Sequence, residues 1–196
     1  MREFFFEFGE DTERVESRRQ APFGFRLGTP AKNRLLQIRP NGFTYSWLRP
    51  YSNWADLRAA AKQAWEIYTD LVMPENVIRA AVRYINHIRL PLPITELRDF
   101  LPASPDYPAE WPQTMTGYLS RIAVVDEASG NRAIVTQTSE QTDERGMMNF
   151  LLDIDCFNAD PPRDAVELWE LLDRLRDLKN QIFFNAVSER LLEMFE

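Results

Sequence analysis

The sequence contains a single cysteine, Cys156, and a single histidine, His87. One cysteine cannot form a disulfide within the chain, and it excludes a cysteine-based zinc site. Only seven glycines are present, and none belongs to the glycine-rich loops that cradle phosphate in P-loop and Rossmann proteins. The sequence therefore excludes those two nucleotide-binding folds, and it predicts neither a cofactor nor a metal ion.

Long apolar runs are also missing. No run approaches the ~20 residues that a membrane-spanning helix needs. The first residues, 1–8, are too short and too acidic for a signal peptide. We therefore expect a cytoplasmic protein that does not associate with a membrane.

Positive charge is in deficit, with 23 Lys and Arg residues against 30 Asp and Glu and a net charge of -7. A negative surface repels phosphate backbones, so the charge disfavours nucleic acid as a partner. Hydrophobic residues make up 44% of the chain, which is enough for a packed core. We expect a single α+β domain over residues 1–196, with two halves joined near 102–116 as the alternative.

Strands and hairpins dominate the predicted fold. Apolar residues in period-2 patterns or in short runs predict strands at 4–8, 35–39, 43–48, 78–90, 119–125, 132–139 and 147–157. The turn 40–42, which contains Asn-Gly, joins the second and third strands into a hairpin. In the third strand Phe43, Tyr45 and Trp47 share one face and Thr44 and Ser46 the other, which predicts a half-buried strand. The sheet should be mainly antiparallel, with helices packed on one face.

Helical patterns appear twice. Ser52 or Asn53 is placed to cap a helix over 54–71, which Pro74 ends. Asp164, followed by Glu167 at capping-box spacing, begins a long C-terminal helix without glycine or proline. This closing segment should form one helix, or two with a bend near Asn180. A short helix is expected at 94–101, and loops at 9–31 and 102–116.

One face of the strand at 78–90 carries a basic row, formed by Arg79, Arg83, His87 and Arg89. Side chains two apart on a strand share a face. The row is therefore a candidate site for phosphate, a nucleotide, nucleic acid or an acidic peptide. The alternative is cross-strand ion pairing with Asp153 and Asp155, which have matching spacing.

Catalytic groups are scarce. Asp126, Glu127, Asp153 and Asp155 are carboxylates that a metal-dependent nuclease or phosphotransferase would use, but nothing in the sequence fixes their geometry. Cys156 shares the apolar face of its strand with Leu152 and Ile154, which argues against a Cys–His pair with His87. No serine lies in a G-x-S-x-G context. No catalytic residue is predicted.

Apolar residues cover more than one face of the closing helix. Beyond a leucine stripe, the additional residues include Phe183, Phe184, Val187, Leu191 and Phe195. A helix that is apolar around more of its circumference needs more than one covering surface. These residues are a candidate interface with a protein partner or with a second copy of the chain.

The segment 82–88, with Arg-Tyr-Ile-Asn followed by His-Ile, resembles the R-Y-I-N-x-I strand of a sporadically distributed prokaryotic family of unknown function. Segments 36–38, 43–47 and 54–65 resemble the same family, and the resemblance covers roughly 33–196. Members of the family often start with an additional Pro-Pro-Ile/Val-x-Glu strand, and the absence of that motif here is expected of a shortened or divergent member. The resemblance supplies no active site, and the patchy distribution implies mobile genes of defence or toxin–antitoxin type.

The sequence as a whole favours a non-enzymatic interaction or assembly protein that binds a protein partner or forms a homo-oligomer. Anion or nucleic-acid binding through the basic row is the first alternative, and a metal-dependent nuclease is the second.

Overall fold

A computed structural model describes residues 2–8, 24–31, 33–39, 41–106, 108, 110–112, 116–140 and 145–195, with the backbone alone for 2–8. The elements are β1 (Arg2–Phe8), β2 (Phe25–Gly28), β3 (Arg34–Arg39), β4 (Gly42–Trp47), α1 (Trp54–Val72), β5 (Val77–Pro91), the 3-10 helix η1 (Leu97–Asp99), β6 (Leu119–Val125), β7 (Arg132–Glu140), β8 (Met147–Asn158), α2 (Ala165–Ala186) and α3 (Glu189–Glu193). The expected α+β class, with antiparallel hairpins and a long C-terminal helix, is confirmed.

The chain divides into two compact units that interleave along the sequence. Unit 1 contains Met1–Arg83 and Phe157–Leu175, and unit 2 contains Tyr84–Cys156 and Arg176–Glu196. β5, β8 and α2 each contribute residues to both units. The segment 102–116 lies within unit 2, away from each point where the chain passes between units. In the described residues no helix is long and apolar enough to cross a membrane.

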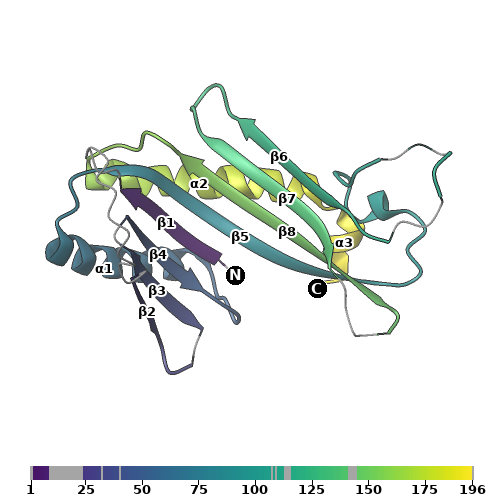
Figure 1. The fold of residues 1–196 in the computed structure, drawn as a ribbon, viewed down its shortest axis with the longest axis horizontal. Helices are drawn as coiled ribbons and strands as arrows, with labels where there is room; N and C mark the ends of the chain where they lie inside the picture. Colours follow the sequence, from purple (N-terminus) through teal and green to yellow (C-terminus); the bar gives the residue numbers. More distant parts are fainter. Residues whose placement is uncertain are drawn as a thin grey trace, which may run out of the picture. The chain divides into compact units, whose positions relative to one another are not determined.

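In unit 1 the strands hydrogen-bond in the order β2-β3-β4-β1, followed by the first part of β5 (Figure 1). The hairpin of β3 and β4 is confirmed, with Arg39 opposite Gly42. β2 corrects the loop expected over 9–31, because residues 25–28 pair with β3. Its four residues are all exposed, and the alternation of Phe25 and Leu27 with Arg26 and Gly28 is too short to predict a strand in a segment rich in Pro and Gly. Residues 9–23 lie outside the described residues.

The core of unit 1 forms where α1 packs on β4. Phe43 is fully buried, and its ring lies 5.4 Å from Trp65 and 5.2 Å from Tyr68. The predicted cap of α1 is confirmed, because the Asn53 side chain accepts a hydrogen bond from the Asp56 amide. Aromatic side chains from a strand and a helix thus fix α1 on the sheet.

The half-buried character predicted for β4 is wrong. Thr44 and Ser46, on the second face, are also buried. They pair with Gln37 and Leu35 of β3, and β4 lies between β3 and β1. β4 is an inner strand, and the side chains of Thr44 and Ser46 are short. The presence of polar residues on this face therefore did not mean that the face is exposed to solvent.

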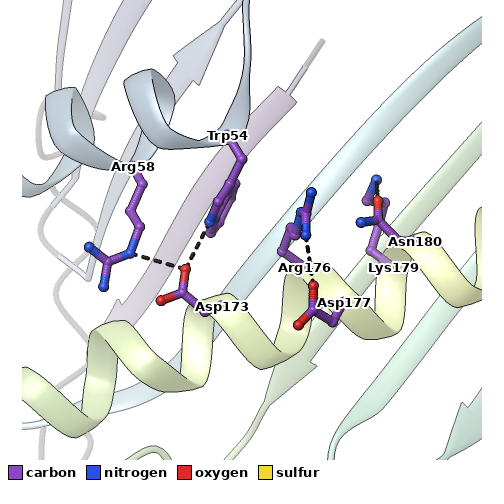
Figure 2. A network of polar contacts seen from close by, with 7 residues as sticks. All are labelled: Trp54, Arg58, Asp173, Arg176, Asp177, Lys179 and Asn180. Carbon is purple, nitrogen blue, oxygen red and sulfur yellow. Dashed lines mark hydrogen bonds and ion pairs between the residues drawn. The ribbon is translucent and has the colours of Figure 1, made fainter.

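Asp173 on α2 connects that helix to α1. Its carboxylate accepts a hydrogen bond of 2.8 Å from the Trp54 indole and forms an ion pair of 3.0 Å with Arg58 (Figure 2). The start of α2 is confirmed as well, because the Asp164 carboxylate accepts the amides of Val166 and Glu167. In unit 1, α2 is therefore held to α1 by charged hydrogen bonds, in addition to the aromatic contacts between α1 and β4.

In unit 2 the order is the later part of β5, then β8, β7 and β6 (Figure 1). The hairpin of β6 and β7 is confirmed, with Val125 opposite Arg132. Phe150, Leu152, Ile154 and Cys156 of β8 are buried, as their shared face predicts. The helix expected at 94–101 is only the single turn η1. In the described part of 102–116 there is no helix or strand, in agreement with the expected loop.

The closing segment forms two helices, but the bend predicted near Asn180 is wrong. α2 continues past Asn180 to Ala186, and the break falls immediately before Ser188. The Ser188 hydroxyl accepts the Leu191 amide and donates to the Asp99 carbonyl oxygen, while the Ser188 amide donates to Phe100. A serine that caps one helix and bonds a distant loop sets the break.

We expect Asp173→Ala to lower the free energy of unfolding by about 1–2 kcal/mol, because Trp54 loses its acceptor and Arg58 its ion pair. Asp177→Ala on the same helix is the control, since Asp177 is exposed and pairs with its sequence neighbour Arg176. Its effect should stay within about 0.5 kcal/mol. Urea unfolding measures both, and equal losses in the two variants would contradict the role of Asp173.

Candidate interaction surface

The basic row predicted on β5 is divided between the two units. In unit 1 the Arg79 guanidinium lies 4.3 Å from the centroid of the Phe157 ring, a cation–π contact with β8. In unit 2 the exposed His87 places Nδ1 3.6 Å from the Glu140 carboxylate of β7. Each of these two side chains therefore has a partner inside its own unit.

Arg83, Arg89, Asp153 and Asp155 also have interactions within the protein. An anion approaching the basic row would have to compete with these contacts for each cation. Anion binding by the basic row stays a prediction. Ion pairing between the basic row and the acidic row, Asp153 and Asp155, stays a prediction as well.

A hollow of about 440 Å³ in unit 2 lies beside Glu140, and Tyr118, Ser139 and Met147 contribute to its lining. The Tyr118 hydroxyl is buried without a hydrogen-bond partner in the described residues. Burial raises the pKa of Tyr118 to about 12. The phenol therefore stays protonated at neutral pH and serves as neither a base nor a nucleophile.

The environment of Cys156 does not suit a nucleophile. The side chain is fully buried on β8. Burial first, and then the Asp155 carboxylate, raises the pKa of Cys156 to about 12, although the Lys179 ammonium acts in the opposite direction. The thiolate is the reactive form of cysteine, so this thiol is inert near neutral pH.

Lys179 itself is buried on α2 in unit 2. Its ammonium lies 4.0 Å from the centroid of the Tyr84 ring and contacts the Asn180 side chain, which Figure 2 shows beside it. These contacts hold a charged side chain inside the fold. Elsewhere in the described residues, no group of three or more His, Cys, Asp or Glu side chains is placed to hold a metal ion.

The predicted interface on the closing helices is only partly exposed. Val187 and Leu191 are buried, at 5% and 1% exposure, whereas Phe184 and Phe195 are about 60% exposed. Phe183 is half-buried and touches Phe184 edge to face at 5.3 Å. Val187 and Leu191 are buried because the helix breaks at Ser188 and α3 turns toward η1. There Arg190 pairs with Asp99 at 3.0 Å.

Strand β6 exposes the most continuous apolar surface in unit 2. Its side chains are exposed on both faces, with Leu119 at 72%, Ile122 at 50%, Val124 at 44% and Val125 at 58%. Arg121 is the only charged residue of the strand. Sequence reasoning predicted β6 but missed its exposure. The continuous apolar run 122–125 is typical of a buried strand, so the residue types gave no signal of this exposure.

β6 is also a sheet edge, because it ends the strand order and has β7 as its one neighbour among the described strands. The Asp126 amide donates to Asn131, and the Ser139 amide donates to Tyr118. In an antiparallel ladder, alternate residues point their backbone groups to one side. The even-numbered residues of β6 therefore bond β7, and the peptide groups of Leu119, Arg121, Ala123 and Val125 face outward.

Exposed edges of this length are normally blocked by charges, proline, bulges or a covering segment. β6 contains one charged residue, Arg121, and no proline.

Comparison of the chain with protein-family models, with curated proteins and with solved structures gave no match. The resemblance to the sporadically distributed family therefore stays a prediction.

We expect protein stability to fall as pH rises above about 8.5, the pKa of a cysteine in an unfolded chain. The folded protein keeps the Cys156 proton up to about pH 12. Between these values the unfolded state binds fewer protons, so stability decreases by up to about 1.4 kcal/mol per pH unit. Urea unfolding between pH 7.5 and 9.5 measures the slope. Tyrosines of the unfolded chain begin to ionise toward the upper end of this range, so the contribution of the thiol is the difference from a variant that lacks it.

Cys156→Ala is the matched variant for this measurement. Its absolute stability is lower because methyl-sized packing is lost, but its slope between pH 8.5 and 9.5 should be flatter than that of the wild type. Identical slopes in the two proteins would show that the thiol ionises equally in both states.

Proposed function

We propose that this protein is a non-enzymatic interaction protein, which assembles with other protein chains through an exposed sheet edge. The observation that supports the proposal is β6, a strand of seven residues with apolar side chains exposed on both faces and outward-facing backbone groups. Strand addition to such an edge satisfies backbone donors and acceptors and buries apolar side chains in the same step.

The chemistry of the described residues supports an interaction role over catalysis. The sole cysteine is buried and protonated, and the sole histidine is paired with Glu140. The carboxylates of the nuclease alternative, Asp153 and Asp155, have interactions within the protein. These features leave no activated nucleophile and no preformed metal cluster in the described part of the chain.

The sporadic distribution implied by the resemblance suits a protein of mobile defence or toxin–antitoxin systems, in which small proteins act by binding a partner. Membership in such a system is a proposal that rests on the resemblance alone. The exposed Phe184 and Phe195 near the C-terminus provide a second apolar surface in unit 2 for the same kind of role.

The test compares three tagged proteins in cells that naturally make the chain: the wild type, Ile122→Lys/Val124→Lys on β6, and Ile67→Lys/Leu71→Lys on α1. All four substituted side chains are exposed, from 44% to 76%, and the two double variants add the same charge. We expect cross-linked complexes with the wild type and the α1 variant, and a loss of about tenfold or more with the β6 variant.

The complexes are quantified by mass spectrometry after cross-linking, and a second copy of the chain counts as a partner. Circular dichroism and urea unfolding establish that both variants are folded. Equal recovery of complexes from all three proteins would overturn the assignment of the interaction to β6. Absence of any complex with the wild type would overturn the proposed function itself.

A further inference from the structure

We infer that the occupant of the β6 edge is a second copy of this chain. The two β6 strands pair antiparallel across a two-fold axis, with Ile122 opposite Ile122. This inference rests on the proposed function and deepens it, because it names the partner and the register of the pairing.

The backbone of β6 fits this arrangement. Its outward-facing residues are Leu119, Arg121, Ala123 and Val125, and they are placed symmetrically about Ile122. In an Ile122-centred pairing, Leu119 lies opposite Val125 of the second copy, and Arg121 lies opposite Ala123. All four outward residues of each copy then form hydrogen-bonded pairs, and no outward peptide group of β6 is left unpaired.

Symmetry restricts the register. A two-fold axis perpendicular to the sheet keeps every side chain on the same face in both copies, so the axis must pass midway between a residue and the same residue of the second copy. A register centred on Arg121 places two like charges opposite each other, which is unfavourable. A register centred on Ala123 moves Leu119 opposite Glu127, in the hairpin turn beyond the strand. The Ile122 register pairs the whole of β6.

The side chains favour the antiparallel orientation. Ile122 meets Ile122, and each Leu119 meets a Val125, so three apolar pairs replace exposed surfaces. Parallel pairing in register would align Arg121 with Arg121 and the turn carboxylates of Asp126 and Glu127 with each other. Antiparallel pairing instead moves the two Arg121 side chains to diagonal positions and places the Asp126 and Glu127 carboxylates of the two copies at opposite ends of the paired strands.

The other end of the strand order is a weaker candidate for such pairing. β2 contains four residues against seven in β6, and Arg26 and Gly28 make up half of it. Although Phe25 and Leu27 are exposed, a strand of this length presents only about two outward residues, which is too little to hold two chains together.

The test is disulfide cross-linking of cysteines placed on β6. In the inferred register residue 122 forms a non-hydrogen-bonded pair with itself, where Cα atoms are about 4.5 Å apart. A disulfide accepts this separation. Ile122→Cys should therefore form a covalent dimer under mild oxidation with copper–phenanthroline. Cys156 does not interfere, because it is buried and its pKa is raised to about 12.

Val124→Cys is the matched control, because Val124 is as exposed as Ile122 and lies on the same face of β6. Residue 124 is about 13 Å from its own copy in this register, at ~3.3 Å per residue, so Val124→Cys alone should not cross-link. An equimolar mixture of Ser120→Cys and Val124→Cys chains should cross-link as a heterodimer, because these two positions lie opposite each other.

Ala123→Pro provides an independent measurement without cysteine. The Ala123 amide faces outward, so proline removes a donor to the second copy and leaves the bonds to β7 in place. We expect sedimentation equilibrium to show a wild-type dimer and a dissociation constant at least about tenfold higher for a folded Ala123→Pro.

Three outcomes would overturn the inference: a monomeric wild type at about 100 µM, equal cross-linking of Ile122→Cys and Val124→Cys, or preferential cross-linking of Ala123→Cys. A monomeric wild type that still captures a different protein through β6 would retain the proposed function and exclude the second copy as its partner. A wild type that neither dimerises nor captures a different protein through β6 would overturn the proposed function as well.

Discussion

Backbone hydrogen bonding is the constraint on which this structure depends. Every peptide group that leaves water needs a partner, and the strands meet this need by pairing with their neighbours on both sides. An inner strand such as β4 is satisfied by β3 and β1, and it is buried along its whole length. β6 is satisfied on the β7 side, and its remaining peptide groups point away from the fold. Where the ladder ends, the physical demand for pairing persists, and the proposed function arises from that demand.

Burial inside unit 2 suppresses the reactivity of side chains that would be reactive in water. The interior raises the pKa values of Cys156 and Tyr118 and so keeps both groups neutral. Lys179 is held against the Tyr84 ring, where its charge is compensated by contacts within the protein. Cys156, Lys179 and the Tyr118 hydroxyl are thus buried groups of unit 2.

The sequence predicted most of the elements, because their signals are local. The Asn53 and Asp164 caps, the alternation in β5 and β8, and both hairpins follow from residue types and spacing alone. β2 was missed because its alternation spans only four residues, and the break before Ser188 was missed because its partner, Asp99, is distant in sequence.

The same distinction explains what was missed at the candidate surface. Residues 119–125 were recognisable as a strand, but the place of that strand at the end of the order depends on pairings between distant segments. The burial of Leu191 depends likewise on the contact of α3 with the η1 region. Local patterns indicate what an element is, whereas long-range contacts decide which of its faces meets solvent.

The position of β8 has a consequence for how the chain acquires its structure during synthesis. β8 is the last of the described strands to leave the ribosome, yet it lies between β5 and β7, which are made before it. Until β8 arrives, the hairpin of β6 and β7 has two open edges, and the nascent chain is at its most vulnerable to wrong pairing. Insertion of β8 closes one of these edges and is therefore the step that commits unit 2 to its final topology.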